Sequence, residues 1–398
     1  MIHNIPSNGG MYGIIPMIYN EVRQMDYRGF LIARERLRKN WSQEGLCKGI
    51  CTVSYLSKIE SGKAVPSAEI WANLLARLGL EYDPALDAEA AALAETGYGL
   101  LFAFRMDALD RLLETQDLSR YSATEASLDL ELLHAIQHTH QRLSDTLEPC
   151  MDTRSLALQR ILQDRCDEAV RLLPNAYTHL MQGVSAYIRG SYATAINALQ
   201  NAYELAAKEG LSRIMLECQL FMGNSYCNQQ DLANMERHYR IASHLAEDLQ
   251  DLRAQQAIQY NMASVWIEVG RYEDAYGWFS VQTQPSVMSL HKLAICCEKL
   301  NKPEEGLQAL DRADTMETEE FNPDLAKQLC ELVRYRLLHP DYLAHEAYGT
   351  LLLDCFHRCR AELSSGYAAF HLPWVLEWYK ATRQYKKACE LLEEFPGK

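Results

Sequence analysis

The sequence predicts an all-α protein in which a small helical domain is followed by a long array of paired helices. Three observations support this prediction. From Asp83 onward apolar residues recur at helical spacing, and no segment alternates in the manner of a strand. A short motif recurs every 40 residues in the second half of the chain. Basic residues gather in one short segment near the amino terminus, although the 398-residue chain as a whole is acidic.

Residues 1–26 are expected to form a mobile arm ahead of the first domain. They contain Gly9, Gly10, Gly13 and two prolines, and they lack the basic start and cleavage site of a secretory signal peptide. No run approaches the roughly 18 apolar residues that a membrane helix needs. The twelve cysteines are scattered, which favours reduced thiols over a disulfide framework. We therefore expect a cytoplasmic protein without disulfides.

The distribution of charge points to one basic module. The formal charge of −14, taken alone, disfavours nucleic acid as a partner because an acidic surface repels phosphate. Between Arg28 and Pro66, however, eight basic and three acidic residues give +5, which leaves −19 for the rest of the chain. Such asymmetry favours a nucleic-acid-binding module attached to a body that does not bind nucleic acid. A basic helix is also often only a solvated face, so the local pattern has to decide.

Four helices are predicted in and just after this segment. Ser42 can cap the second helix, and either Thr52 or Ser54 can cap the third, because their hydroxyls accept hydrogen bonds from free backbone amides. Gly62 supplies the left-handed conformation that commonly closes a helix. Two short helices joined by a tight turn form a helix-turn-helix, whose second helix enters the DNA major groove. The residues expected to face inward are Leu31, Ile32, Ala33 and Leu37 of the first helix, Val53, Leu56 and Ile59 of the third, and Ile70, Trp71, Leu74, Leu75 and Leu78 of the fourth.

The letters of this segment carry a family resemblance. Ser42-Gln43-Glu44-x-Leu46, then Gly49-Ile50-Cys51-Thr52-Val53-Ser54-Tyr55-Leu56-Ser57-Lys58-Ile59-Glu60-x-Gly62-Lys63 and Pro66-Ser67, resemble the XRE-type helix-turn-helix. Gly45 and Cys47 depart from its commonest form, and the turn is one residue shorter. The short Gly-Ile-Cys turn is similar to that of the RRNPP peptide-pheromone receptors of Gram-positive bacteria (the Rgg, NprR, PlcR and PrgX group). That resemblance implies a repeat domain behind the DNA-binding module.

The third helix supplies most of the expected DNA contacts. If Val53, Leu56 and Ile59 face inward, the opposite side is left for the groove. Tyr55 could instead pack against the neighbouring loop, and we expect Glu60 to be structural, bonded to backbone or to an arginine of the first helix. The family resemblance assigns Gln43 a phosphate contact, where helix amides also favour an anion. The candidate DNA-binding residues are Gln43, Thr52, Ser54, Tyr55, Ser57 and Lys58.

The body of the chain repeats. Gly190-Ser-Tyr192-Ala-Thr-Ala195 and Gly270-Arg-Tyr272-Glu-Asp-Ala275 match each other, with a degenerate copy midway at Gln230-Asp-Leu232-Ala-Asn-Met235. Each copy has a small residue seven positions earlier and an apolar residue four positions after its last member, which lets two antiparallel helices approach closely. The small and apolar partners are Gly183 and Leu199, Gly223 and Tyr239, and Ala263 and Phe279. Weaker copies begin at Asp164, Asn301 and Arg383.

This spacing resembles the tetratricopeptide repeat, a two-helix unit of about 34 residues, lengthened by about six. The resemblance implies an α-solenoid whose stacked repeats curl around a concave groove. The predicted organisation is therefore a mobile arm at residues 1–26, an XRE-type helix-turn-helix domain at 27–83, a helical linker or divergent repeats at 84–150, and a tetratricopeptide-like sensor domain at 151–398.

The spacing of that family places a set of asparagines and aromatic residues on the groove. A side-chain amide both donates and accepts, so it can pair with the backbone of an extended peptide, while tyrosines and leucines form pockets for its side chains. Asparagine is also a poor mid-helix residue. Ordinary exposure or inter-helix bonding is the alternative explanation for each one. The candidate peptide-binding residues are Tyr187, Leu220, Asn224, Asn228, Tyr260, Asn261 and Ser264.

The other motifs in the sequence do not support a metal site or an enzyme. Cys355-x-His357-x-Cys359 offers at most a partial metal site, and buried thiols explain it better. No phosphate-binding glycine loop and no nucleophile elbow are present, so we expect no enzyme, cofactor or metal. The resemblance implies a homodimeric transcription regulator that binds a DNA operator and is controlled by a short quorum-sensing peptide in the groove. The alternative is a protein-interaction scaffold in which the repeats bind a protein partner and DNA binding is secondary.

Overall fold

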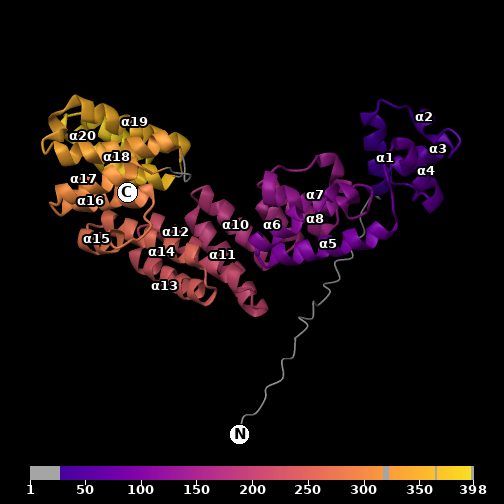
Figure 1. The fold of residues 1–398 in the computed structure, drawn as a ribbon, viewed down its shortest axis with the longest axis horizontal. Coiled ribbons are helices and arrows are strands. Elements are labelled where there is room, and N and C mark those ends of the chain that lie inside the picture. Colours follow the sequence, from indigo (N-terminus) through magenta and orange to yellow (C-terminus); the bar gives the residue numbers. More distant parts are fainter. Residues whose placement is uncertain (1–26, 317–321, 364, 396–398) are drawn as a thin grey trace, which may run out of the picture. The chain divides into compact units, whose positions relative to one another are not determined.

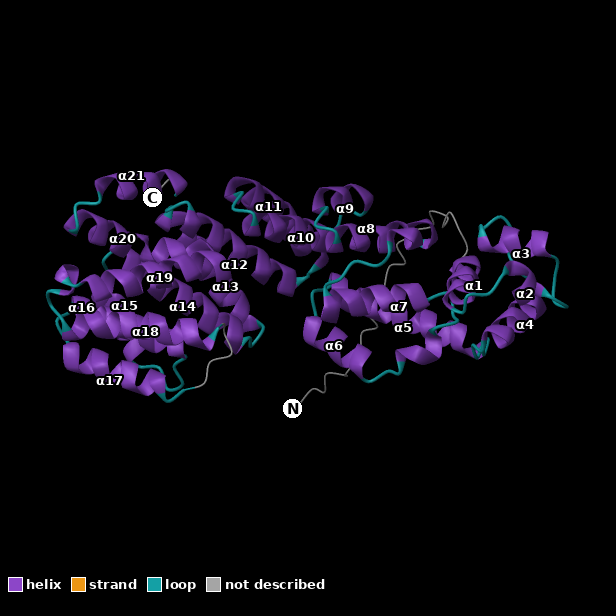
Figure 2. Ribbon diagram, turned by 90° about the horizontal axis from the view of Figure 1, so that it is seen from above, coloured by secondary structure: helices purple, strands orange, loops and turns teal. Residues whose placement is uncertain are grey.

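The computed structural model describes residues 27–316, 322–363 and 365–395, and every regular element in those ranges is helical (Figure 2), which confirms the all-α prediction. The mobile arm expected at residues 1–26 lies outside the described ranges. The chain forms two compact units that divide between Met181 and Gln182, within the helix α10. Figure 1 follows the chain from the first unit into the second by colour.

The first unit opens with the four predicted helices. The cap of the second is confirmed, since the Ser42 hydroxyl accepts a hydrogen bond from the Gly45 amide at 3.0 Å. Of the two candidates for the third, Thr52 is the cap, accepting from the Tyr55 amide at 3.2 Å. The bounds are α1 Tyr27–Arg38, α2 Gln43–Cys47, α3 Val53–Glu60 and α4 Ala68–Leu78 (indigo in Figure 1).

The core of these helices corrects two predictions. Leu31, Ile32, Leu56 and Ile59 are buried as expected, and so are Trp71, Leu74, Leu75 and Leu78. Leu37 and Val53 were expected to face inward but are 62% and 42% exposed. A helix turns by about 100° per residue, so residues three apart drift by about 60°, and Val53 falls outside the face that holds Leu56 and Ile59. In α1 the same rotation carries Leu37 out, and the inward position belongs to Glu35, only 3% exposed and paired with Arg34 and Arg38.

Part of the rest of the first unit shares that core. Ala123, Leu128, Leu147, Cys150 and Met151 belong to the same buried cluster as the four opening helices. The helix-turn-helix therefore packs on the helices that follow it. Their bounds are α5 Ala85–Phe102, α6 Met106–Glu114, η1 Leu118–Tyr121, α7 Ser127–His134, the π-helical η2 Ala135–Thr139, η3 Asp145–Cys150, α8 Thr153–Leu162 and α9 Cys166–Leu172, and α10 Ala176–Ile188 leads into the second unit.

The second unit is a succession of antiparallel helix pairs (rose through orange to yellow in Figure 1). Consecutive helices pack on each other throughout it, which confirms the predicted repeat architecture. The bounds are α11 Tyr192–Glu209, α12 Ser212–Asn228, α13 Leu232–Asp248, α14 Leu252–Glu268, α15 Tyr272–Ser280, α16 Val287–Lys299, α17 Pro303–Asp314, α18 Pro323–Leu338, η4 Tyr342–Ala344, α19 Glu346–Glu362, α20 Ser365–Ala381 and α21 Tyr385–Glu394.

The turn inside each predicted repeat copy has one geometry. Its first residue has a positive φ, and the next residue's amide donates to the carbonyl five positions earlier, as from Ser191 to Ala186 at 2.9 Å and from Arg271 to Trp266 at 2.7 Å. This is the Schellman closure of a helix, which satisfies carbonyls left open at its end. In all six copies identified in the sequence the first residue has a positive φ: Asp164, Gly190, Gln230, Gly270, Asn301 and Arg383.

The small residues inside the repeats are explained by close helix contact. A Cβ added to Gly183 would lie 2.6 Å from Leu199 Cγ, and one added to Gly223 would lie 2.5 Å from the Tyr239 ring. Ala263 and Phe279, the third pair, are both buried. The predicted pairing of a small residue with a large apolar one therefore sets how closely the two helices of a repeat approach.

Candidate functional site

The outward face of α3 carries most of the residues predicted to bind DNA. Ser54, Ser57 and Lys58 are exposed there, and Thr52, also exposed, is the cap at the start of the helix. Tyr55 is half-buried, and its hydroxyl donates to the Val65 carbonyl at 3.2 Å. Tyr55 thus packs on the neighbouring loop, the alternative that the sequence left open for it. The exposed hydroxyls and ammonium remain as groups that can reach base edges or phosphates.

Gln43 belongs to a network that fixes α3 against α1 and α2. Arg36 donates to both carboxylate oxygens of Glu60, at 2.7 and 2.8 Å, and the Gln43 amide donates to the same carboxylate at 2.8 Å. The hydrogen bond and charge of Glu60 raise the pKa of Arg36. The structural role expected for Glu60 is therefore confirmed. Glu60 holds Gln43 in place at the first position of α2, one residue after the Ser42 cap.

In the second unit, six of the seven predicted groove residues line one cavity of about 190 Å³. They come from α10, α12 and α14, and the seventh, Leu220, packs against the buried cluster around Met235 instead of lining the cavity. The structure thus brings together side chains from three helix pairs on a common wall. The six residues are Tyr187, Asn224, Asn228, Tyr260, Asn261 and Ser264.

Hydrogen bonds across helices preorganise this wall. The Asn224 side-chain oxygen accepts from the Tyr239 hydroxyl at 2.6 Å and from the Asn261 amide at 3.3 Å. Within α12, the Asn228 side-chain amide donates to the backbone carbonyl of Asn224 at 2.9 Å. Inter-helix bonding, the alternative explanation for these asparagines, therefore applies to the side-chain oxygen of Asn224. These hydrogen bonds hold the side-chain amides in fixed positions, which lowers the entropic cost of binding a peptide backbone.

The far wall of the cavity was not predicted. It is formed by α16 and the start of α20, with Lys292, Tyr367 and Phe370, and Glu268 stands at the end of α14. Lys292 is only 6% exposed. The repeat motif is weak or missing in this part of the sequence, so no local signal placed these helices opposite α14.

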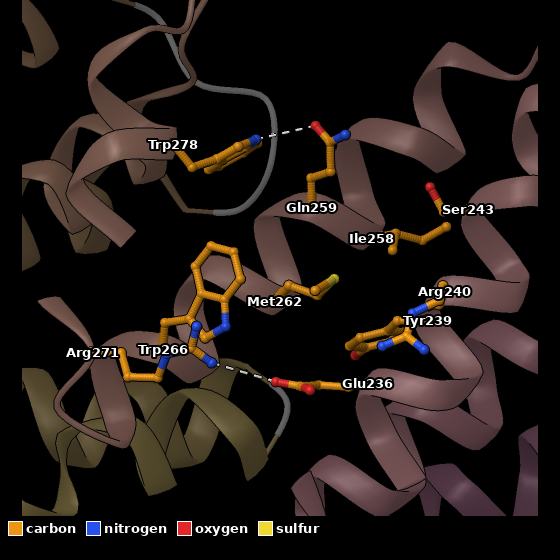
Figure 3. Close-up of a pocket in the computed structure, with 10 residues that line it drawn as sticks. All are labelled: Glu236, Tyr239, Arg240, Ser243, Ile258, Gln259, Met262, Trp266, Arg271 and Trp278. Atoms are coloured by element: carbon orange, nitrogen blue, oxygen red, sulfur yellow. Dashed lines mark hydrogen bonds and ion pairs between the residues drawn. The ribbon is translucent and has the colours of Figure 1, made fainter. Parts of the chain in front are cut away.

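A second cavity, of about 500 Å³, lies among α13, α14 and α15 (Figure 3). Trp266, Trp278, Met262 and Ile258 give it an apolar lining, and Tyr239 lines both cavities. Polar contacts at its edge are made within the protein: the Trp278 indole donates to Gln259 at 3.1 Å, and Arg271 pairs with Glu236 at 3.5 Å. This cavity was not predicted from the sequence either.

The remaining sequence candidates have structural explanations. Cys355 and Cys359 are buried while His357 is exposed, so their side chains do not converge on one point, and burial raises the pKa of both thiols. The interpretation of these cysteines as buried thiols is confirmed. All twelve cysteines are free. None of the described helices has the length and apolar character required to cross a bilayer.

Comparison with known proteins agrees with this architecture. A helix-turn-helix family model matches residues 32–84. The amino-terminal module is a helix-turn-helix domain. A solved structure of a Rap protein in complex with Competence and Sporulation Factor matches 77% of this chain and 97% of its own, with a TM-score of 0.54 and 16% identity. The chain therefore shares the fold of that protein.

Two further solved structures are more distant in shape. The apo form of the quorum sensor NprR from B. thuringiensis matches 91% of this chain and 98% of its own, with a TM-score of 0.46 and 14% identity. Bacillus thuringiensis PlcR in complex with the peptide PapR7 and DNA matches 58% of this chain and 99% of its own, with a TM-score of 0.30 and 13% identity. No curated protein sequence matches this chain.

Proposed function

We propose that this protein is a DNA-binding transcription regulator whose activity is controlled by a short signalling peptide held in the cavity between α10–α14 and α16–α20. The observation that carries the proposal is the presence in one chain of a helix-turn-helix domain and a cavity walled by preorganised asparagines and tyrosines. The first reads an operator, and the second is chemically suited to an extended peptide backbone.

The DNA-binding half of the proposal rests on α3 and the charge around it. Residues 28–66 carry a formal charge of +5 in a chain of −14, so this segment is the one that phosphate attracts. Ser54, Ser57 and Lys58 point outward from α3, and Gln43 stands at the start of α2. A helix-turn-helix usually reads two half-sites related by symmetry, so we propose a homodimer as the form that binds DNA.

The peptide half rests on the donors and acceptors of the cavity. Asn228 and Asn261 come from different repeats and lie on one wall, where their amides can pair with a peptide backbone of any sequence. Tyr187, whose pKa is raised by burial, and Tyr260 supply the aromatic surface for its side chains. The Rap protein that shares this fold was solved with Competence and Sporulation Factor bound, which supports a signalling ligand for this chain.

Regulation requires the peptide to bind one conformation of the protein more tightly than another, because a ligand with equal affinity for both does not shift the equilibrium between them. The cavity wall is built from helices of several successive pairs, from α10 to α20. A peptide that bridges them would favour one curvature of the array. We propose that this change of curvature is what alters operator binding.

The DNA claim is tested by selecting bound sequences from a random duplex library and measuring their affinity by fluorescence anisotropy. The double variant Ser54→Ala, Lys58→Ala should lose at least about tenfold in affinity, since it removes contacts worth roughly 1–3 kcal/mol. Lys208→Ala, an exposed lysine of α11, is the matched control and should bind like the unaltered protein. Undiminished binding by the double variant would count against α3 as the reading helix.

The scaffold alternative is separated by ligand size. Short peptides retained by the cavity, and lost on Asn261→Ala, support the peptide receptor. A chain that selects no DNA sequence and retains no short peptide, yet forms a stable complex with a folded protein partner, would replace the proposal with the scaffold.

A further inference from the structure

Lys292 has an unusual place in the cavity. It lies on α16 and is 6% exposed, yet it is one of the lining residues. Its ammonium stands 3.0 Å from the centroid of the Phe370 ring. Within residues 27–316, 322–363 and 365–395, no acceptor forms a hydrogen bond with it and no carboxylate forms an ion pair with it. A nearly buried lysine is rarely left in this state, because burial penalises a charge unless an anion offsets it.

The surroundings of Lys292 do not supply that anion. Burial lowers its pKa to about 7, and the charge of Glu268, which lines the same cavity without forming an ion pair with Lys292 in the described residues, opposes this shift. The two nearby histidines, His291 and His371, cannot supply a negative charge, because an imidazole is either neutral or cationic. Burial lowers the pKa of both, so both are neutral at pH 7. The Phe370 ring offers its face, which attracts a cation much more weakly than a carboxylate does in a site removed from water.

We propose that Lys292 is the anchor for a carboxylate of the signalling peptide. This inference rests on the proposed function and adds the chemistry of its ligand. The other described cavity residues offer amides, hydroxyls and aromatic surface, which suit backbone and side chains, while the ammonium is the one described lining group that matches a full negative charge. A carboxylate would give Lys292 the charge-assisted hydrogen bond that the protein itself does not provide. The carboxylate is either the carboxyl terminus of the peptide or an aspartate or glutamate side chain.

The test uses four pools of randomised heptapeptides offered to the full-length protein. One pool has free carboxyl termini and contains Asp and Glu, one is amidated and contains them, one has free termini without them, and one is amidated without them. Retained peptides are identified by mass spectrometry. We expect at least about tenfold more retention from pools with a carboxylate than from the pool with none, since a hydrogen bond between charged groups is worth roughly one to two powers of ten in affinity. Comparing the two intermediate pools tells the terminal carboxylate from a side chain.

Two variants show whether the preference belongs to Lys292. Lys292→Met should retain peptides from all four pools equally, while Lys299→Met, an exposed lysine of the same helix, should keep the preference of the unaltered protein. Equal retention from all pools by the unaltered protein overturns the anchor and leaves the peptide receptor standing. Retention from none of the pools overturns the peptide receptor and the anchor with it. A preference that survives in Lys292→Met also overturns the anchor.

Discussion

Gly223 is the position where the repeat geometry can be tested most sharply. An added Cβ would lie 2.5 Å from both Cδ1 and Cε1 of Tyr239, well inside the contact distance of two carbons. The ring cannot move aside easily. It is 1% exposed, and its hydroxyl is held by Asn224 at 2.6 Å. Gly223→Ala therefore forces α12 and α13 apart instead of displacing a flexible side chain.

The expected size of the effect follows from two opposing terms. Overpacking a buried site costs typically 1–3 kcal/mol. Alanine regains up to about 1 kcal/mol because glycine is a poor helix former. Because the Cβ would overlap two carbons of a ring that is held in place, the upper part of that cost range applies, and the net loss should be about 1–2 kcal/mol in the free energy of unfolding. For a unit of this size each kcal/mol moves the melting temperature by roughly 2–4 °C, so a fall of about 2–8 °C is expected.

Thermal unfolding followed by far-ultraviolet circular dichroism measures this shift. Gly277→Ala is the matched control, because Gly277 also lies inside a helix, α15, but an added Cβ meets nothing within 4 Å. That variant should melt at the same temperature or slightly higher, through helix propensity alone. If Gly223→Ala were as stable as Gly277→Ala, close contact of α12 with Tyr239 would not be what the glycine provides.

Three further predictions concern the sites. Lys292→Met should raise the free energy of unfolding by about 4 kcal/mol at pH 7, because the folded pKa of about 7 lies below the ordinary 10.5; the cost of the lysine is full below pH 7 and fades as the pH rises to 10.5, so equal stabilities at pH 7 in denaturant titrations would contradict it. Asn224→Ala should lower the melting temperature through its lost bond to buried Tyr239, whereas Asn261→Ala should leave it nearly unchanged and weaken peptide retention, and the reverse order would refute the roles given to them. Glu60→Ala should cost about 2–3 kcal/mol and weaken operator binding by leaving the Arg36 guanidinium unpaired; an unchanged chemical denaturation curve would contradict that role.

The parts of the fold that local chemistry controls could be predicted from the sequence. Ser42 caps a helix because its hydroxyl lies within hydrogen-bonding distance of the Gly45 amide, three residues along the chain. Gly190 and Gly270 end helices because the turn there requires a residue with positive φ. The other four turns adopt the same conformation without glycine. The 40-residue period identified Gln230, and the residues that follow the turn, not the turn residue itself, identified Asp164, Asn301 and Arg383. The pairing of Gly223 with Tyr239 is likewise a matter of fixed spacing within two adjacent helices.

The features that depend on the cumulative curvature of several helix pairs could not be predicted from the sequence. Lys292 and Phe370 line the same cavity as Asn261 because the array places α16 and α20 opposite α14. No single segment of the sequence determines that arrangement. The pair α18 and α19 was also missed, since η4 joins them and the glycine–tyrosine motif is absent there. Inside the helix-turn-helix domain, the sequence alone does not distinguish a DNA contact by Tyr55 from packing on the neighbouring loop. The position of the Val65 carbonyl, which accepts its hydrogen bond, decides between them.

In the proposed mechanism, a peptide in the cavity changes how α3 binds an operator. The direct measurement is the affinity of the full-length protein for its selected operator, by fluorescence anisotropy at fixed salt, with and without a saturating amount of the peptide most strongly retained from the pools. We expect a change of at least about fivefold, the lower range of coupling between allosteric sites, and its loss in Asn261→Ala at the same peptide concentration. An operator affinity that stays the same while the cavity is saturated would contradict it.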